Sequence, residues 1–404
     1  MTTTAVPATW AADAGAGAAP GGAHARLVPQ PPTDRVAGWL WPLAVTLVAG
    51  VLRFVRLDEP RTLVFDETYY AKDAFALLRY GYEHQFVDKA NERLLAGDTN
   101  VFTGGGSFVV HPPAGKWVIA VGEWLFGMTP FGWRFMTALL GTLAVLVLAR
   151  TTRRMTGSTL LGSTAGLLLA VDGLSLVESR TALLDPLLAF WVLAAFGCLV
   201  VDRDRARARL AALGDGTGPG PRLGGRPWRV AAGVCLGLAV ATKWSGAWYA
   251  AAFPVLALLW DVGARRSLGV RRPLRGVLRR DLPPAALTLG LLPVGVYLAS
   301  WTGWLATSGG WGRQWAAGQA TSWPFVPAAL RSLWHYHAEM LRFNVNLREP
   351  HPYQSNPWGW LVMARPTSFF YETPPAGSPG CPVAPCSREV LALGTPLLWW
   401  GATL

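Results

Sequence analysis

The stretch LLDPLLAFWVLAAFGCLVV, residues Leu183–Val201, holds one charged residue, Asp185, in 19 positions. A run of about 20 apolar residues is long enough to cross the hydrocarbon core of a membrane as a helix. Similar stretches lie on both sides of it along the chain. The predicted spans are Gly38–Val55, Phe131–Ala149, Leu160–Leu176, Leu183–Val201, Val230–Lys243, Ala247–Trp260, Leu282–Trp301 and one that begins near Val390. The sequence therefore predicts an all-α polytopic membrane protein.

The composition of the whole chain supports this fold class. Of its 404 residues, 51% are hydrophobic and 15% are charged, and the mean hydropathy is +0.28. A soluble domain averages about 25% charged residues, so this chain lacks the polar residues that a water-facing surface needs. A soluble enzyme, a disulfide-rich secreted module and a disordered chain are excluded.

The net charge of +12 is concentrated in short clusters between the spans. The stretches 150–154, 203–229 and 262–282 hold 17 Arg in 53 residues, which places them on the cytoplasmic side. The stretch 57–130 holds six Lys or Arg against ten Asp or Glu and is expected to face outward. Clusters confined to membrane loops argue against a nucleic-acid partner.

These features divide the chain into four segments. We expect a disordered cytoplasmic tail over 1–36, a transmembrane core over 37–303, an extracellular loop over 304–388 and the start of a further transmembrane helix over 389–404. Within the core, the outer loop 57–130 includes a helix at Pro112–Phe126, which is expected to lie at the outer membrane surface. Cys381 and Cys386 fall in the extracellular loop, where they form either a small disulfide or two free thiols.

An acidic pair, Asp66 and Glu67, opens an amphipathic stretch on the outer side that ends at Gly81, a typical C-cap. Two interpretations are open. Asp66 can cap the helix while Glu67 complements the helix dipole. Alternatively, a carboxylate at this place can accept a proton from an attacking hydroxyl.

Several other ionisable residues lie at or near the same outer face, where an ionisable group costs several kcal/mol unless it is paired or hydrated. They are His111, Lys116, Arg134, Arg180, Asp185 and Lys243. Individually, Lys116 is explained by snorkelling to the interface, and Arg180 can pair with Asp185. Together, cations and an acidic pair suit a lipid-phosphate donor, because cations stabilise the charge of a leaving phosphate.

The sequence also lacks several motifs that would indicate other chemistry. It contains no Walker A loop, dinucleotide-binding fingerprint, HExxH or CxxC pair. We therefore expect no metal and no separate cofactor, and favour a lipid-linked donor over a soluble nucleotide.

Six motifs occur in an order that resembles one family. They are FDETYYAKDA, HPPAGKW, GWRF, DGLSLVESRTALLDP, ATKWSG and HPYQSNPWGWLVMARP, within residues 65–366. The chain resembles the protein O-mannosyltransferase family, most closely its actinobacterial branch that uses polyprenol-phosphate-mannose. The resemblance covers about residues 37–404.

The resemblance implies a GT-C glycosyltransferase in the cell membrane with its active site on the extracytoplasmic face. It implies transfer of one mannose, with inversion, from polyprenyl-phosphate-mannose to Ser or Thr hydroxyls of secreted proteins. Coupling to the secretion channel is a further expectation.

The resemblance also assigns roles to residues. Asp66 is the expected base, and Glu67 is expected to hold the acceptor or orient the site. Arg134, Arg180, Asp185 and Lys243 are expected near the donor phosphate and sugar. His111 and Lys116 are expected to support the His-Pro-Pro motif.

Three alternatives remain. The first is a related transferase of the same fold that acts on a glycolipid or glycan. The second is a transporter or channel, although the chain lacks a convincing internal repeat. Because family members usually continue beyond the motif at Leu393–Trp400, the chain also looks truncated at its C-terminus, and an inactive remnant is the third alternative.

Overall fold

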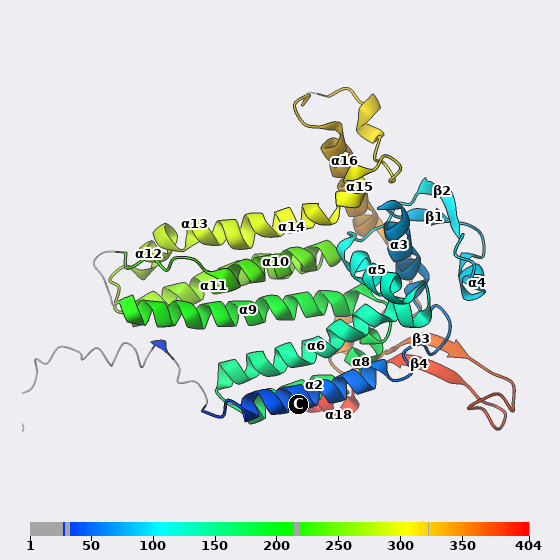
Figure 1. Cartoon of the computed structure of the whole chain (residues 1–404), viewed down its shortest axis with the longest axis horizontal. Helices are drawn as coiled ribbons and strands as arrows, with labels where there is room; N and C mark the ends of the chain where they lie inside the picture. The colour runs from blue at the N-terminus through cyan, green and yellow to red at the C-terminus, as the bar shows by residue number, and fades with distance from the viewer. Residues whose placement is uncertain (1–26, 29–32, 214–218, 322, 404) are drawn as a thin grey trace, which may run out of the picture.

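The computed structural model describes residues 27–28, 33–213, 219–321 and 323–403. Most of the predicted tail, residues 1–26 and 29–32, lies outside these described residues. Figure 1 shows long helices side by side along the molecule, with most of the short elements gathered at one end and the short helix α12 (Pro273–Arg280) at the other. The long helices are α2 (Ala37–Phe54), α6 (Pro130–Thr156), α7 (Thr159–Val171), α9 (Leu184–Leu213), α10 (Pro227–Thr242) and α11 (Gly246–Ser267).

The last long rod is composite, and its parts are α13 (Leu282–Ala285), the π-helix η1 (Ala286–Leu291) and α14 (Leu292–Ser300). In the described part of the chain, α2, α6, α9, α11 and this rod are long and apolar enough to cross a membrane. A sixth candidate is α7 with α8 (Gly173–Ser179), which are bent by 63° at their junction. The predicted class, a mostly helical multi-span membrane protein, is confirmed.

The helices form two groups. One group consists of α2, α6 and α7, and the other of α9, α10, α11 and α14, while α6 and α9 pack together and join them. The boundary between α6 and α7 follows from local chemistry. Gly157 ends α6 with a positive φ of 70°, and the Ser158 side chain then accepts the Leu161 N–H to cap α7.

The arginine cluster in the stretch 203–229 contributes buried ion pairs to the end of the bundle opposite α3 and α5. Arg226 lies just before α10, and Arg229 lies in its first turn. Both bind Asp202 of α9 and Asp261 of α11. The Arg229 Nη2–Asp261 Oδ2 distance is 2.6 Å, and both side chains are buried. These residues therefore tie three helices together in addition to supplying charge, because buried charges need partners.

Small residues allow α10 to approach the composite rod closely. Gly233 and Gly237 lie one turn apart on α10. A Cβ at Gly233 would overlap the Thr288 carbonyl of η1, and a Cβ at Gly237 would lie 2.6 Å from Val296 Cβ. This is the small-residue packing by which membrane helices bring their backbones together.

The segment 57–130, which we expected to be the outer loop, forms a compact group of short elements beside α6. These elements are α3 (Glu67–Tyr80), β1 (His84–Phe86), α4 (Ala90–Leu95), β2 (Phe102–Gly106) and α5 (Ala114–Phe126). The predicted C-cap of α3 is present, since Gly81 has a φ of 81°. In the core, Ala71 and Ala74 of α3 pack with Ile119 of α5.

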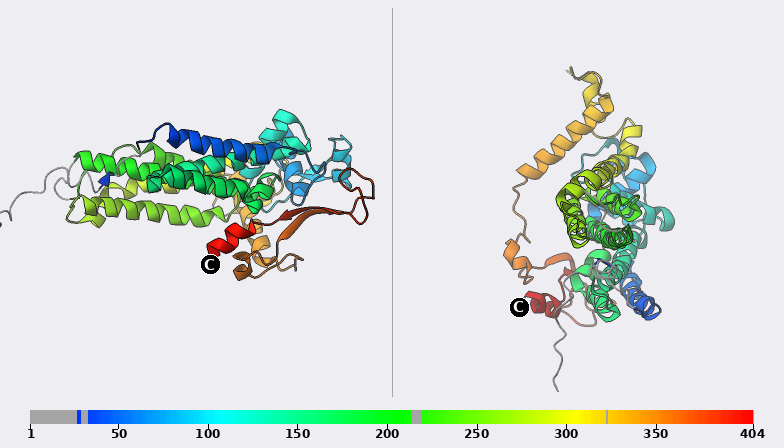
Figure 2. Two further views of the ribbon diagram at one scale, coloured as in Figure 1. Left: turned by 90° about the horizontal axis from the view of Figure 1, so that it is seen from below. Right: turned by 90° about the vertical axis from the view of Figure 1, so that its left-hand side faces the viewer.

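The remaining polar segment adds further short elements. They are α15 (Thr302–Ala306), η2 (Trp315–Gly318), α16 (Ala328–Asn346), α17 (Pro357–Trp360), β3 (Thr367–Glu372), β4 (Arg388–Ala392) and α18 (Pro396–Thr403). Seen down the bundle in Figure 2, α16 runs across the axis of the long helices. In the structure Cys381 and Cys386 form a disulfide, with Cα atoms 5.6 Å apart.

We expected the start of a helix over 389–404, but the structure has a strand followed by a short helix in this segment. Val390 lies in β4, where it pairs with Phe370 of β3, and the helix begins only at Pro396. The apolar run was too short to distinguish a strand from a helix end, and the pairing with β3 decided between them. Proline then fixes a backbone angle suited to the first helical position.

The close contact between α10 and η1 yields a prediction about stability. Gly233→Ala is expected to destabilise the protein by about 1–3 kcal/mol, because the new methyl group overpacks the interface. Gly263→Ala in α11 is the matched control, since nothing lies within 4 Å of its added Cβ and Ala favours a helix over Gly. Thermal unfolding in detergent would measure both variants. Equal stability of the two would contradict the proposed packing.

Candidate active site

Asp66 occupies the N-cap position of α3, but its half-buried carboxylate does not cap the helix. The capping interpretation is therefore wrong for this side chain. Burial raises the pKa of Asp66, and the nearby charge of Asp185 raises it further. Lys243 and a hydrogen bond from Tyr70 lower the same pKa. The result is a carboxylate that holds a proton more strongly than usual, as a general base requires.

The neighbouring residue, Glu67, is fully buried and forms a two-pronged ion pair with Arg134 of α6. Glu67 Oε1 accepts from Arg134 Nε and Oε2 accepts from Nη2, each at 2.8 Å. The same carboxylate accepts the backbone N–H groups of Val64 and Ala182, each at 2.9 Å. These four hydrogen bonds together use the full acceptor capacity of the Glu67 carboxylate.

Arg134 directs its other N–H groups at the loop that precedes α3. Its Nη1 donates to the carbonyls of Leu57 and Pro60 at 3.2 and 2.9 Å, and its Nη2 donates to Thr62 at 2.8 Å. A guanidinium has five N–H groups, and these bonds together with those to Glu67 use all five. In this geometry no N–H of Arg134 is left over for a phosphate.

Arg180 lies against the end of α2. It donates to four carbonyls there at 2.8–3.0 Å. The accepting residues are Leu52, Arg53, Val55 and Arg56. These bonds satisfy carbonyls that a helix end leaves without intrahelical partners. The suggested pairing with Asp185 is wrong, because Asp185 pairs with Lys243.

Lys243 and Asp185 form an ion pair on the more open side of the site. Lys243 Nζ lies 2.8 Å from Asp185 Oδ1, and the two side chains are 29% and 48% exposed. Asp185 also contributes to the wall of an apolar groove of about 370 Å³ between α9 and α11. Further along, the groove is lined by Leu188, Val192, Phe196, Tyr249 and Phe253.

Lys116 lies inside the group of outer elements. It is 1% exposed and bonds to Glu83, and its Nζ lies 3.9 Å from Asp73 Oδ2. The snorkelling interpretation of Lys116 is therefore wrong. Burial raises the pKa of Asp73 to about 7, although the charge of Lys116 lowers it. A cation held by two carboxylates fixes α3, α5 and the turn before β1 together.

His111 is half-buried, with its ring centroid 6.2 Å from that of Tyr70. Burial lowers the pKa of His111 to about 4, and the charges of Lys243 and Lys116 act in the same direction. The imidazole is therefore neutral at pH 7.

The eight ionisable residues expected at the outer face thus fall into two sets. Glu67 and Arg134 use their full hydrogen-bonding capacity within the protein. Lys116 is buried in an ion pair, and Arg180 is bound to backbone carbonyls. Asp66, His111, Asp185 and Lys243 are only partly buried, and we call them the accessible set. Among the described residues, no group of three or more His, Cys, Asp or Glu is arranged to hold a metal ion.

Comparison with known proteins identifies the family. Residues 43–302 match the family model described as dolichyl-phosphate-mannose-protein mannosyltransferase. Residues 329–404 match the C-terminal four TMM region of protein-O-mannosyltransferase. The chain belongs to the protein O-mannosyltransferase family. This membership makes it a glycosyltransferase, and the expected family is confirmed.

Bacterial relatives of this mannosyltransferase are similar along nearly the whole chain. The polyprenol-phosphate-mannose–protein mannosyltransferase of Mycolicibacterium smegmatis (strain MKD8) is 42% identical over 93% of the chain and 72% of the relative. The enzyme of the same name from Mycobacterium tuberculosis (strain H37Rv) is 43% identical over 91% of the chain and 70% of its own length. The Corynebacterium glutamicum relative is 35% identical over 93% of the chain and 73% of its own length.

Among solved structures, the chain is similar to the Saccharomyces cerevisiae protein O-mannosyltransferase Pmt1-Pmt2 complex bound to the sugar donor. The identity is 21%, the TM-score is 0.49, and the match covers 67% of this chain but 34% of that one. ArnT from Cupriavidus metallidurans in the apo state is 20% identical with a TM-score of 0.48, over 80% of this chain and 47% of its own.

Sequence reasoning missed the partners of the charged residues. Asp73 lies in the same motif as Asp66, but nothing local indicated that it would pair with Lys116. Glu83 lies in no quoted motif. His351, whose charge lowers the pKa of Asp66, is separated from it by most of the chain, so no spacing rule could connect them.

The bidentate pair between Glu67 and Arg134 yields a second prediction. Glu67→Gln is expected to cost about 3–5 kcal/mol of stability, because it leaves a buried guanidinium without its counter-charge. Arg93→Gln is a suitable control, since Arg93 and Asp98 are 43% and 38% exposed and such pairs contribute about 1 kcal/mol or less. Thermal unfolding in detergent would measure both. A Glu67→Gln protein as stable as the control would show that the pair does not hold the loop.

Proposed function

We propose that this chain transfers a single mannose from polyprenyl-phosphate-mannose to Ser or Thr hydroxyls of polypeptides, at the extracytoplasmic face of the membrane. The observation that carries the proposal is the accessible set of four residues. Asp66 lies near an exposed Lys243–Asp185 pair, at a place where an apolar groove begins between two membrane helices. The names of the bacterial relatives supply the donor and acceptor classes.

In this mechanism Asp66 accepts the proton of the attacking hydroxyl as the oxygen bonds to the anomeric carbon. The bond between that carbon and the phosphate oxygen breaks, and polyprenyl phosphate leaves with the electron pair. A single displacement of this kind inverts the anomeric centre. A phosphate needs no proton in order to leave, so one carboxylate is sufficient, unlike in glycosidases, which use two.

Lys243 is positioned to bind the donor phosphate. Its ammonium has three N–H groups, of which Asp185 takes one, so others remain for phosphate oxygens. The apolar groove beside Asp185 suits the first isoprenyl units of the donor, because an apolar chain is stabilised by apolar walls. Glu67, Arg134 and Arg180 then act as positioning residues rather than as direct ligands of the donor or acceptor.

The orientation follows from charge. The arginine clusters lie at the end of the bundle opposite α3 and α5, and the positive-inside rule assigns that end to the cytoplasm. The acidic pair, the lysine and the outer loop are then extracytoplasmic. A disulfide between Cys381 and Cys386 is compatible with that compartment.

The decisive experiment is transfer of labelled mannose from polyprenyl-phosphate-mannose to a Ser/Thr-rich peptide by membranes that contain this chain. Wild type is expected to label the peptide, and Asp66→Asn is expected to lose at least 100-fold in rate while retaining its stability. This behaviour contrasts with that of Glu67→Gln, which loses stability. Wild-type turnover by Asp66→Asn would remove the base assignment, and label found only in glycolipid or glycan would remove the protein acceptor.

The raised pKa of Asp66 predicts a pH dependence. The base must be deprotonated, so kcat/KM is expected to fall tenfold per pH unit below a pKa that lies above the usual value for Asp. Asp185→Asn removes a negative charge that raises this pKa, and the acidic limb is expected to shift to lower pH. A pH–rate profile of both proteins measures the shift. If the acidic limb of the Asp185→Asn profile stays in place or moves to higher pH, the proposed effect of Asp185 on the pKa of Asp66 is contradicted.

A further inference from the structure

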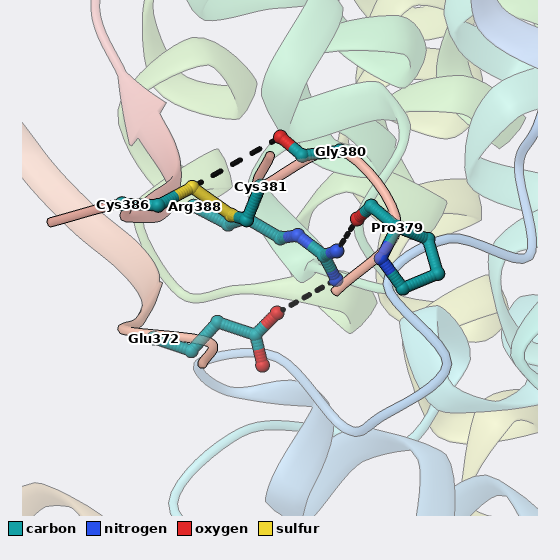
Figure 3. Close-up of a disulfide and its surroundings, with 6 residues drawn as sticks. All are labelled: Glu372, Pro379, Gly380, Cys381, Cys386 and Arg388. Atoms are coloured by element: carbon teal, nitrogen blue, oxygen red, sulfur yellow. Dashed lines mark hydrogen bonds and ion pairs between the residues drawn. A yellow bond between two sulfur atoms is a disulfide. The ribbon is translucent and has the colours of Figure 1, made fainter. Parts of the chain in front are cut away.

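The β3–β4 hairpin is held together by more than its backbone ladder. Figure 3 shows the Cys381–Cys386 disulfide, which lies in the loop between the strands, and Arg388, which bonds to Glu372 on the opposite strand and to the Pro379 carbonyl. An isolated two-stranded hairpin is marginally stable in water, so these cross-links fix a ribbon that would otherwise fray.

One strand of this hairpin lies beside the proposed base. The pairing register of β3 shifts between Ser368 and Phe370, which leaves Phe369 as a bulged residue. The Phe369 ring stacks on that of Phe65, with centroids 4.4 Å apart and planes 6° from parallel. Phe65 directly precedes Asp66, so β3 is anchored one residue from the carboxylate.

The outer edge of β3 is open. Among the described residues the sheet has two strands, and β4 is the strand that packs near α8. Within that described part, β3 forms no backbone–backbone hydrogen bonds outside this sheet. One row of its N–H and C=O groups therefore has no backbone partner, and such a row is a template for another extended chain.

We propose that the outer edge of β3 binds the acceptor polypeptide as an added strand, which brings a Ser or Thr hydroxyl to Asp66. This inference rests on the proposed function and adds how the acceptor is held. Strand addition takes its affinity from main-chain hydrogen bonds, so it accepts many sequences around the hydroxyl. A six-residue strand spans about 20 Å, which is enough for several acceptor residues.

Strand addition has a signature with a period of two residues. Successive N–H groups of an extended chain point to opposite sides, so alternate acceptor N–H groups face β3. The same alternation turns alternate side chains toward the base. A peptide held by its side chains in a pocket would show no such period.

The test uses binding rather than transfer, with the Asp66→Asn chain in membranes so that no product forms. A Ser/Thr-rich peptide with a terminal photo-crosslinking group is prepared in a series that is N-methylated at one backbone position at a time. Crosslinking to the 367–372 segment is expected, and N-methylation at alternate positions is expected to weaken it at least tenfold. The proposal would be overturned if the peptide does not crosslink to this segment. It would also be overturned if N-methylation weakens crosslinking without alternating from one position to the next.

A pair of variants adds a second measurement. Phe369→Ala removes the stack on Phe65 and is expected to reduce peptide crosslinking several-fold. Val383→Ala, which lies outside β3 in the loop between the strands and is 70% exposed, is expected to leave it unchanged. Equal effects of the two would count against anchoring beside Asp66. Because the peptide series needs no change in β3, its result holds even if Phe369→Ala disturbs the hairpin.

The two proposals fail in different ways. Alternating binding without mannose transfer by the wild-type chain would remove the proposed reaction and keep the strand-addition site. Mannose transfer without alternating binding would keep the reaction and remove this site.

Discussion

The ion pair between Glu67 and Arg134 joins three parts of the chain that are distant in sequence. Its carboxylate also binds the backbone at Val64 and Ala182, and its guanidinium holds the loop over 57–62. The start of α3, the N-terminal end of α6 and the turn before α9 are therefore fixed relative to one another. Asp66 lies next to this junction, so its position follows from the pair.

Burial and pairing together explain why the charged residues separate into two sets. A buried charge is tolerated only when it is paired, and Glu67, Arg134 and Lys116 meet this condition with partners inside the protein. A residue that binds a substrate must keep some of its hydrogen-bonding capacity free for that substrate. Lys243 and Asp185 do so because they lie where the outer elements meet the groove and remain partly exposed.

The late segment of the chain completes the site from the other side. Phe369 of β3 reaches Phe65, and Asp172 at the α7–α8 bend binds Thr395 and Trp399 after β4. Tyr297 of α14 likewise bonds to His337 of α16 and accepts the indole N–H of Trp244, the neighbour of Lys243. Residues that supply the proposed chemistry are thus supported by segments that follow them by more than fifty positions.

The sequence by itself determined the membrane class, the positions of most spans and the family. Hydrophobic length and arginine placement are local properties, and the ordered motifs can be read without a structure. It also singled out Asp66 and Lys243, because an ionisable residue beside an apolar span is conspicuous. The tertiary structure alone decided how the buried charges are paired. Glu67 with Arg134, and Lys116 with Glu83, are pairs between distant segments, and no local pattern encodes which partner a buried charge will meet.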